Sequence, residues 1–478
     1  MNLDADSCYR ALTTHDARFD GRFFVGVSST RIYCRPVCTV RTPRRANCRF
    51  FPSAAAAEVE GYRPCLRCRP ELSPGMASVD ATARLAQAAV DQIEAGALED
   101  GSLEALAERV GVTSRHLRRV FVAQFGVAPI EFAQTQRLLL AKRLLTDTAL
   151  PVTEIALASG FHSLRRFNAL FKTRYRMAPG RLRKARAPGA LPDTLRFELA
   201  YRPPYAFDAM LAFLRDRAIP GVEAVTGTTY ARSLALAHRG TVHEGVVAVR
   251  RAPRKAALAV ELSASFAHVV PLVLARVKHA FDLAANPAEI DAHLGALATA
   301  NPGLRVPGTF DGFELAVRAI VGQQISVRGA RTMLGRVAGA LGPPLAAPHA
   351  AIVRRFPDAA GVATAGPAAL AQCGLTPARA RTIAALANAV ATGGLTLGPD
   401  ADVDATLARL QAIPGIGPWT ANYIAMRALR WPDAFLANDL VVLRALKETR
   451  SALAQARSDQ WRPWRSYAVM HLWKGSST

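Results

Sequence analysis

The chain has 478 residues and sets 60 lysines and arginines against 37 aspartates and glutamates, which gives a formal net charge of +23. A chain of this length is too long for one hydrophobic core and should form several domains. So large an excess of basic residues favours nucleic acid as a partner. High-GC codon bias, which enriches arginine and alanine, is the alternative explanation of the charge. No run of about 18 apolar residues occurs and the N-terminus has no signal-like pattern, so we exclude a membrane partner and expect a cytoplasmic protein.

Four of the seven cysteines form two tight pairs, Cys34-x3-Cys38 and Cys65-x2-Cys68. Cytoplasmic thiols stay reduced, so such pairs indicate a metal rather than disulfides. Four thiolates from two turns suit one tetrahedral zinc ion, and we predict zinc and no redox cofactor. A purely structural zinc site is the alternative, because so small a module buries little apolar surface. The other three are predicted to be core residues or inert thiols: Cys8, Cys48 and Cys373.

The segments around these pairs, TRIYCRPVC and GYRPCLRCRPE, resemble the zinc domain of the Ada methyl-transfer proteins, which predicts such a domain at 1–73. The resemblance implies that Cys34 is both a zinc ligand and the irreversible acceptor of methyl groups from DNA methylphosphotriesters. Six arginines and no acidic residue lie from Arg31 to Arg49, so we expect the site to face phosphate. Four residues match family positions that contact the DNA backbone, although arginines can also be simply solvated: Thr30, Arg41, Arg63 and Arg67.

The charge of such a site predicts a switch. Four thiolates on one Zn²⁺ leave a net charge of about −2, which makes the sulfurs electron-rich nucleophiles. Methylation of one sulfur removes one unit of that charge and lowers the repulsion from a DNA phosphate. We therefore expect methylation to strengthen DNA binding.

Residues 103–121 read LEALAERVGVTSRHLRRVF, with apolar positions at helical spacing, a Gly-Val turn and capping residues at Thr113 and Ser114. The pattern returns at 152–171, and FGVAP returns as YRMAP, which predicts two helix-turn-helix units. The segment 80–185 resembles the AraC-type DNA-binding domain. The expected base-reading residues are Arg115, His116, Arg118, Arg165 and Arg166. The expected core residues are Leu117, Val120, Phe121, Phe167 and Phe171.

A Pro, Gly and Ala-rich segment predicts a linker at 186–194. Segments 195–300 and 301–478 follow, the first mixing strands with helices and the second largely helical. The predicted fold is therefore multidomain and mainly α with α+β parts. Its expected pieces are a four-cysteine zinc domain, a double helix-turn-helix domain, a β-rich subdomain similar to TATA-binding protein, and an all-α helix-hairpin-helix domain.

Residues 410–429 read LQAIPGIGPWTANYIAMRAL, and FLANDL follows with Asp439. The glycines Gly415 and Gly417 let backbone amides approach a DNA phosphate at a helix N-terminus. These segments resemble the helix-hairpin-helix glycosylases, and 195–478 resembles 3-methyladenine glycosylases of the AlkA type. The resemblance implies that Asp439 is catalytic; a plain helix cap is the alternative.

An alkylated purine carries positive charge, so its glycosidic bond is weak and its pocket should offer a carboxylate and aromatic faces. The residues that match the family's pocket aromatics are Trp419, Tyr423, Trp473 and, more weakly, Phe213. Asn438 replaces a second acidic residue found in related enzymes, and Gln324 replaces an apolar wedge. Trp419 replaces the lysine of strand-cutting relatives, which predicts a monofunctional glycosylase.

We expect one chain that accepts methyl groups, activates transcription and excises alkylated bases. The alternatives are a regulator with a structural zinc site and an attached glycosylase, and a DNA-binding protein with both sites dead. The expected partners are alkylated and promoter double-stranded DNA and RNA polymerase, with the protein a monomer.

Overall fold

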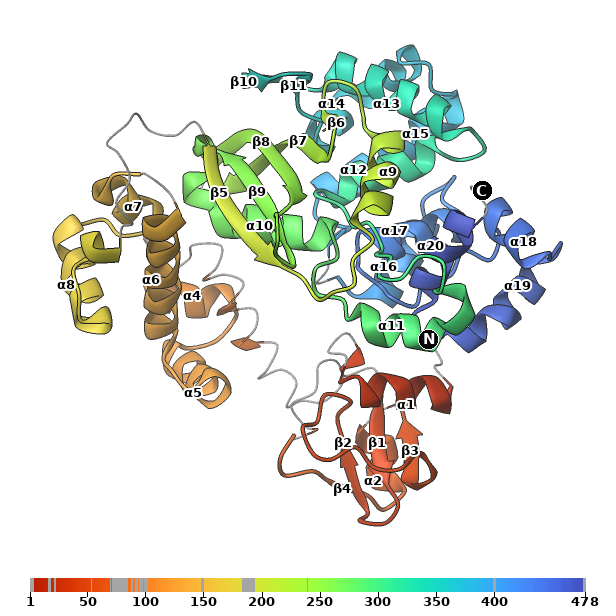
Figure 1. The fold of residues 1–478 in the computed structure, drawn as a ribbon, viewed down its shortest axis with the longest axis horizontal. Helices are drawn as coiled ribbons and strands as arrows, with labels where there is room; N and C mark the ends of the chain where they lie inside the picture. Colours follow the sequence, from red (N-terminus) through yellow and green to blue (C-terminus); the bar gives the residue numbers. More distant parts are fainter. Residues whose placement is uncertain are drawn as a thin grey trace. The chain divides into compact units, whose positions relative to one another are not determined.

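The structure is a computed structural model that describes residues 4–15, 23–52, 54–68, 102–147, 150–182, 194–238, 240–398 and 401–475, with the short stretches 19–20, 70, 85–86, 89–90, 93 and 98. The chain divides into two compact units, Met1–Leu191 with His238–Thr241, and Pro192–Ala237 with Val242–Thr478. Figure 1 labels the helices and strands of both units. The predicted multidomain organisation is confirmed. The predicted linker 186–194 lies outside the described residues except for Thr194, which begins a strand.

The first unit begins with a small four-stranded sheet and two helices (Figure 1). Its elements are α1 (Ala5–Thr13), β1 (Phe24–Val27), β2 (Ile32–Cys34), a 3₁₀ helix (Arg45–Asn47), β3 (Cys48–Phe51), α2 (Ala54–Val59) and β4 (Arg63–Pro64). The strand order is β3-β1-β2-β4, with β1 antiparallel to β2 and β3, and β2 parallel to β4. Parallel pairing brings the ends of β2 and β4 side by side, and both cysteine pairs begin there.

Aromatic rings form the core of this sheet. Phe24, Tyr33 and Tyr62 are buried. A Cβ on Gly26 of β1 would lie 2.6 Å from the ring of Phe51 and 2.8 Å from that of Tyr62, so glycine is needed for the rings to pack over the strand.

The two predicted helix-turn-helix units follow. Their elements are α4 (Leu103–Arg109), α5 (Ser114–Phe125), α6 (Pro129–Asp147), α7 (Val152–Ala158), α8 (Leu164–Tyr175) and a 3₁₀ helix (Pro179–Leu182). Gly111 and Gly160 both have φ +75°, a left-handed conformation that glycine adopts at low cost. The Oγ of Thr113 caps α5 and that of Ser163 caps α8. The five predicted core residues are buried.

The second unit begins with a five-stranded sheet of order β5-β9-β8-β7-β6 (Figure 1). Its elements are β5 (Thr194–Ala200), α9 (Phe207–Arg217), β6 (Glu223–Thr226), β7 (Thr229–His238), β8 (Thr241–Arg251), β9 (Ala257–Ser263), a 3₁₀ helix (Ala264–Val269) and α10 (Val270–Ala280). Strand β5 alternates exposed and buried residues, because one face of the sheet covers the core. The predicted mixture of strands and helices is confirmed.

Helices dominate the remainder. They are α11 (Pro287–Leu294), a 3₁₀ helix (Gly295–Leu297), α12 (Gly312–Val321), α13 (Val327–Leu341), α14 (Ala359–Gln372), α15 (Pro377–Ala391), α16 (Val403–Gln411), α17 (Pro418–Arg427), α18 (Leu440–Leu446), α19 (Ser451–Ser458), a 3₁₀ helix (Asp459–Trp461) and α20 (Arg465–Gly475). Their shared core includes the buried residues Leu315, Ile320, Ile383, Leu410 and Ile424. Among the described helices, none is long and apolar enough to cross a membrane.

One detail of the all-α prediction is wrong. The strands β10 (Pro344–His349) and β11 (Ile352–Arg354) form a two-stranded hairpin within the segment 301–478, which we expected to be all-α. Leu345 and Ile352 are buried against Val246 of the five-stranded sheet. The hairpin exists because a neighbouring apolar surface covers it, which local composition does not reveal.

Candidate zinc centre and base-excision pocket

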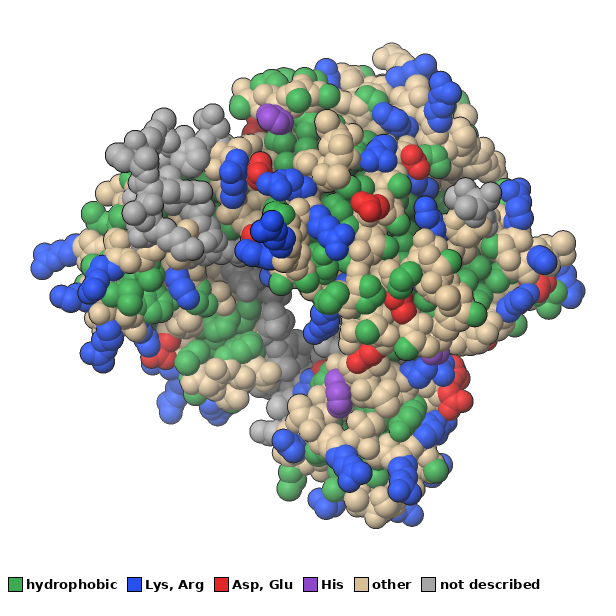
Figure 2. All heavy atoms as spheres, viewed as in Figure 1, with side chains coloured by type: hydrophobic (Ala, Val, Ile, Leu, Met, Phe, Trp, Pro, Cys, Tyr) green, Lys and Arg blue, Asp and Glu red, His purple; other side chains and the backbone are tan. Residues whose placement is uncertain are grey.

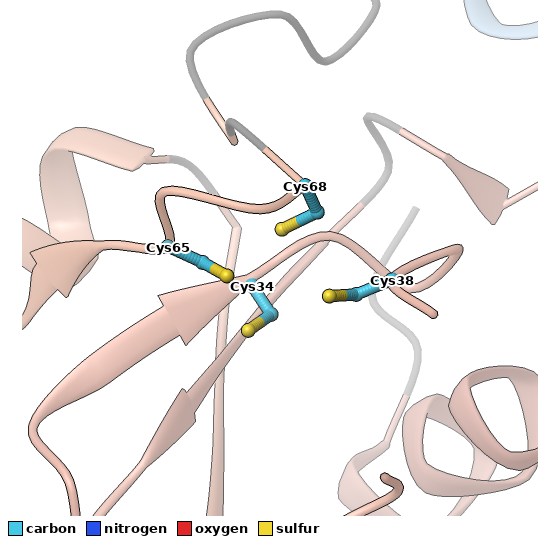
Figure 3. A group of neighbouring side chains, drawn as sticks. All are labelled: Cys34, Cys38, Cys65 and Cys68. Atoms are coloured by element: carbon cyan, nitrogen blue, oxygen red, sulfur yellow. The ribbon is translucent and has the colours of Figure 1, made fainter. Parts of the chain in front are cut away.

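The four paired cysteines converge on one point. Cys34 ends β2 and Cys65 directly follows β4, and the parallel pairing of these strands places their side chains together. The four Sγ atoms lie within 4.8 Å of one another, and all but Cys68 belong to buried residues. Figure 3 shows the four side chains pointing toward a common centre. A regular tetrahedron with Zn–S distances of about 2.3 Å has S···S edges of about 3.8 Å, so the cluster fits zinc.

The chemistry of the cluster also calls for a cation. The hydrogen bond between the Cys34 and Cys68 thiols, with burial, raises the pKa of Cys34 far above its usual range, and the same bond lowers the pKa of Cys68 to about 6. The backbone N–H of Arg35 donates to Cys68 Sγ at 3.4 Å. Thiols packed this closely are stabilised as thiolates when a divalent cation lies among them.

Three of the arginines near the cluster pair with acidic side chains, whereas other basic residues there are exposed. Arg45 pairs with Asp6 at 2.7 Å and Arg49 with Glu60 at 3.1 Å, while Arg35 pairs with Asp20. The sequence predicted that a site with six arginines and no acidic residue faces phosphate, but acidic side chains from other segments engage these three arginines. The four predicted backbone-contacting residues all lie exposed: Thr30, Arg41, Arg63 and Arg67.

The predicted base-reading residues lie at the starts of α5 and α8. Four of them have exposed side chains: Arg115, Arg118, Arg165 and Arg166. His116 is half-buried, and its Nδ1 lies 3.1 Å from Nη2 of Arg119. The four arginine side chains are therefore exposed to solvent, whereas His116 contacts Arg119 of the same helix.

The second unit contains a cavity of about 1060 Å³, large enough for an extruded base. The structure brings all five predicted pocket residues to its wall, although they come from α9, α17, α18 and α20. These residues are Phe213, Trp419, Tyr423, Asp439 and Trp473. Gln324 and Asn438, the two departures from the family pattern, also line it.

Asp439 is the N-cap of α18, so its role as a helix cap is confirmed, and it lines the cavity as well. Its Oδ1 accepts hydrogen bonds from the backbone N–H groups of Val441 and Val442 and from Trp473 Nε1, each at 3.0 Å. Its Oδ2 accepts one hydrogen bond, from Trp419 Nε1 at 3.0 Å. Four donors fix this carboxylate in place, and the residue is only 9% exposed.

The aromatic wall is a stack. The rings of Trp419 and Tyr423 are nearly parallel, with centroids 5.3 Å apart and an interplanar angle of 11°. Trp473 lies 6.3 Å from Tyr423. These three rings and Asp439 form one continuous surface, because the two indoles that line the cavity also hold the carboxylate.

Two arginines that the sequence analysis missed occupy the remaining aromatic faces. The guanidinium carbon of Arg217 lies 3.8 Å from the ring centre of Phe213, and that of Arg427 lies 4.9 Å from it. Arg427 also donates to the hydroxyl of Tyr423 at 2.5 Å. Burial raises the pKa of Tyr423, but both arginines outweigh that effect and lower it. Each arginine follows its aromatic partner by four residues, a helical spacing that could have revealed the contact.

Buried ion pairs form another part of the wall. Arg232 of β7 binds Glu314 of α12 at 2.6 Å, and Arg318 of α12 binds Glu223 of β6 at 2.6 Å. Burial opposes the charge of Glu314, but the two arginines lower its pKa to about 2. The pairs that link the sheet to α12 could not be predicted from the sequence, because their members lie about 80 to 95 residues apart.

The hairpin between α16 and α17 depends on Gly415. Gly415 has φ +93°, and a Cβ there would collide with Oγ1 of Thr382, whereas Gly417 has open space around it. The side chain of Gln323 donates to the carbonyl of Gly415 at 2.9 Å. The neighbouring Gln324 is exposed and has φ +54°, an uncommon conformation for a residue other than glycine.

Four protein-family descriptions match the chain. They are the metal binding domain of Ada at 7–71, a helix-turn-helix domain at 106–185, the AlkA N-terminal domain at 196–311 and the HhH-GPD superfamily base excision DNA repair protein at 317–463.

Three relatives show how these parts combine. A probable bifunctional transcriptional activator/DNA repair enzyme AlkA of Mycobacterium tuberculosis (strain CDC 1551 / Oshkosh) is 39% identical over 490 residues, covering 99% of this chain and 97% of the relative. DNA-3-methyladenine glycosylase 2 of Escherichia coli (strain K12) is 39% identical over 277 residues, covering 58% and 96%. The bifunctional transcriptional activator/DNA repair enzyme Ada of the same strain is 34% identical over 166 residues, covering 33% and 43%.

Among solved structures, a 3-methyladenine DNA-glycosylase from Archaeoglobus fulgidus matches with a TM-score of 0.51 and 19% identity, over 59% of this chain and 98% of that one. The similarity shows a shared fold.

Proposed function

The chain belongs to the family of bifunctional transcriptional activator/DNA repair enzymes, and from that premise we propose the residues and steps by which it acts. It joins an Ada-type zinc domain and a helix-turn-helix domain to a DNA glycosylase. We propose the boundaries 1–73, 80–185, 195–300 and 301–478 for its domains. We further propose that it acts on DNA in the cytoplasm as a monomer and that it recruits RNA polymerase to the promoter.

Methyl transfer is assigned to Cys34. Cys34, Cys38, Cys65 and Cys68 would hold one zinc ion, which keeps their sulfurs as thiolates at neutral pH. The Cys34 sulfur attacks the methyl carbon of a phosphotriester. The new C–S bond replaces the methyl C–O bond, and the DNA regains an anionic phosphodiester.

The transfer is also a switch. It removes one negative charge from the cluster, so the repulsion between this site and the DNA backbone falls. The exposed Thr30, Arg41, Arg63 and Arg67 are proposed to contact the backbone. Arg115, His116, Arg118, Arg165 and Arg166 are proposed to contact operator bases, so methylated protein would bind its promoter more tightly.

Base excision is assigned to Asp439, and the observation that carries this assignment is its position on the cavity wall with four hydrogen-bond donors. The carboxylate would stabilise the cationic sugar as the N-glycosidic bond breaks and the alkylated purine leaves as a neutral base. Water would then add to the sugar carbon and lose one proton to solvent, which gives the abasic site. Trp419, Tyr423 and Trp473 would hold a cationic base by cation–π contact, with Phe213 behind them. Gly415 and Gly417 would bind a backbone phosphate, and Gln324 would fill the space left by the extruded base.

Two measurements test the assignments. After incubation with methylated DNA, mass spectrometry should find one added methyl group, on Cys34; an adduct on another cysteine would overturn the acceptor. In the second, alkylated duplex is incubated with the enzyme and borohydride. We expect free base, abasic DNA and no trapped protein–DNA adduct, because Trp419 has no nucleophilic amine; a trapped adduct would identify a lysine nucleophile.

A further inference from the structure

A second cleft lies in the five-stranded sheet subdomain, between the connection that follows β5 and the turn that joins β8 to β9. It has a volume of about 680 Å³. Its lining includes the rings of Tyr201 and Tyr205, prolines of both segments, and Arg250, Arg251, Arg254 and Lys255. None of these residues belongs to the base pocket.

The cleft carries an excess of positive charge. Between Glu244 and Glu261 the sequence has four basic residues and no acidic one. Lys255 pairs with Glu198 at 2.7 Å, and Arg250 lies 3.6 Å from Glu261. Figure 2 shows Lys and Arg side chains gathered over the face where β5 and β9 lie.

The two remaining cations are free. Arg251 and Arg254 have exposed side chains, and within the described part of the chain neither has an acidic partner or a hydrogen bond for its guanidinium. Arg254 has φ +59°, which is uncommon for an arginine. Two guanidinium groups are therefore held at the cleft with all their donors available.

The floor of the cleft is rigid. The backbone N–H of Tyr201 donates to the carbonyl oxygen of Ala256 at 3.0 Å. This hydrogen bond joins the connection that follows β5 to the turn between β8 and β9. The rings of Tyr201 and Tyr205 meet edge to face at 4.9 Å, and the Tyr205 hydroxyl donates to the carbonyl of Phe281 at 2.9 Å. A cleft fixed in this way needs little ordering when a ligand binds.

We propose that this cleft binds phosphates of the DNA backbone and gives the glycosylase a second DNA contact outside the base pocket. A free guanidinium presents a planar fork of donors that matches two phosphate oxygens. An exposed rim suits a continuous duplex, whose phosphates are the most abundant anions on the proposed substrate. The proposal rests on the proposed function, since it assigns a further contact to the same DNA.

The test uses the full chain and compares Arg251→Ala/Arg254→Ala with wild type. Single-turnover excision from a long alkylated duplex is measured against enzyme concentration at several salt concentrations. Arg215→Ala/Arg336→Ala is the matched control, because it removes the same charge from exposed positions on α9 and α13. Arg251→Lys/Arg254→Lys keeps both positive charges and removes only the planar fork of N–H donors that each guanidinium offers.

We expect the cleft variant to need more enzyme for half-saturation while its maximal rate stays unchanged. Losing two phosphate contacts should reduce the slope of log affinity against log salt by about 1.8, so between about 50 and 200 mM salt the wild type should lose roughly tenfold more affinity than the variant. The control should keep the wild-type slope, and the lysine variant should keep most of it.

A cleft variant with the wild-type slope and half-saturation would overturn the proposal. Equal effects in the control would overturn it too, by showing a general charge effect. If inorganic phosphate or a mononucleotide bound the cleft while the DNA slope stayed unchanged, the site would serve a small anion instead. Failure of the wild type to excise any base would refute the proposed function, whereas the slope for binding to undamaged duplex would still test the cleft.

Discussion

Replacing Asp439 with Asn should separate catalysis from folding. Asn is as good a helix N-cap as Asp, so α18 keeps its start. The amide oxygen should occupy the Oδ1 position, where three donors meet it: Val441 N–H, Val442 N–H and Trp473 Nε1–H. The amide nitrogen then faces the N–H of Trp419, which now bonds to Oδ2. Two donors then point at each other at a residue that is only 9% exposed.

That clash should cost about 1–3 kcal/mol of unfolding free energy, the usual penalty for an unmet buried donor. Losing the negative charge at the sugar should slow excision on the order of 100-fold or more. The two effects have different origins, so a second substitution can separate them. Trp419→Phe removes the opposing N–H, and in that background Asp439→Asn should cost little stability while excision stays lost.

The measurements are urea unfolding and single-turnover excision of 3-methyladenine, for both single variants and the double variant. Trp473→Phe is the matched control, because its indole bonds to the oxygen that Asn retains and its removal should not relieve the clash. The reasoning is refuted if Asp439→Asn costs the same stability in the wild-type and Trp419→Phe backgrounds, or if the variant excises at nearly the wild-type rate.

Four further outcomes are expected. Cys34→Ala should abolish methyl uptake from phosphotriesters and leave base excision intact, and methylation of Cys34 in the wild type should tighten DNA binding less as salt rises, both read by binding and uptake assays. Burial lowers the pKa of His471 to about 4, so as pH falls this imidazole takes up a proton in the unfolded chain before it does so in the folded chain. Between pH 7 and pH 5 this difference should remove about 2 kcal/mol of stability. Burial also lowers the pKa of His279, to about 3, so urea unfolding of His471→Leu should show a smaller loss than the wild type over this range. Gly415→Ala should destabilise the second unit by about 1–3 kcal/mol, because of its φ and its collision with Thr382, whereas Gly417→Ala should leave the melting temperature unchanged.

Much of the fold and of the candidate site could be predicted from local motifs. The cysteine pairs, the repeated helix-turn-helix phrases and the PGIG hairpin each depend on residues close together in the chain, and backbone geometry follows from such spacing. Asp439 and Trp419 were found because two short motifs contain them. The hydrogen bond between them was not, since it depends on the angle between α17 and α18.

Charge was harder to interpret. The stretch from Arg31 to Arg49 contains no acidic residue, yet Asp6 and Glu60 reach two of its arginines from other segments. The arginines behind the pocket are the converse case. The contact of Arg217 with Phe213 lies within one helix and could be predicted from the spacing of four residues, whereas only the tertiary fold brings Arg427 over the same ring. Pairing between distant segments has no local signature.

The buried ion pairs between the sheet and α12 limit how such a protein could have been assembled. Arg232 and Glu223 come from the sheet, whereas Glu314 and Arg318 come from the helix. If the sheet were lost by recombination, Glu314 and Arg318 would keep their own pair at 2.6 Å and lose their partners in the sheet. A descendant without the sheet would therefore expose to water an ion pair that now lies in a dry interior, where it would contribute little to stability.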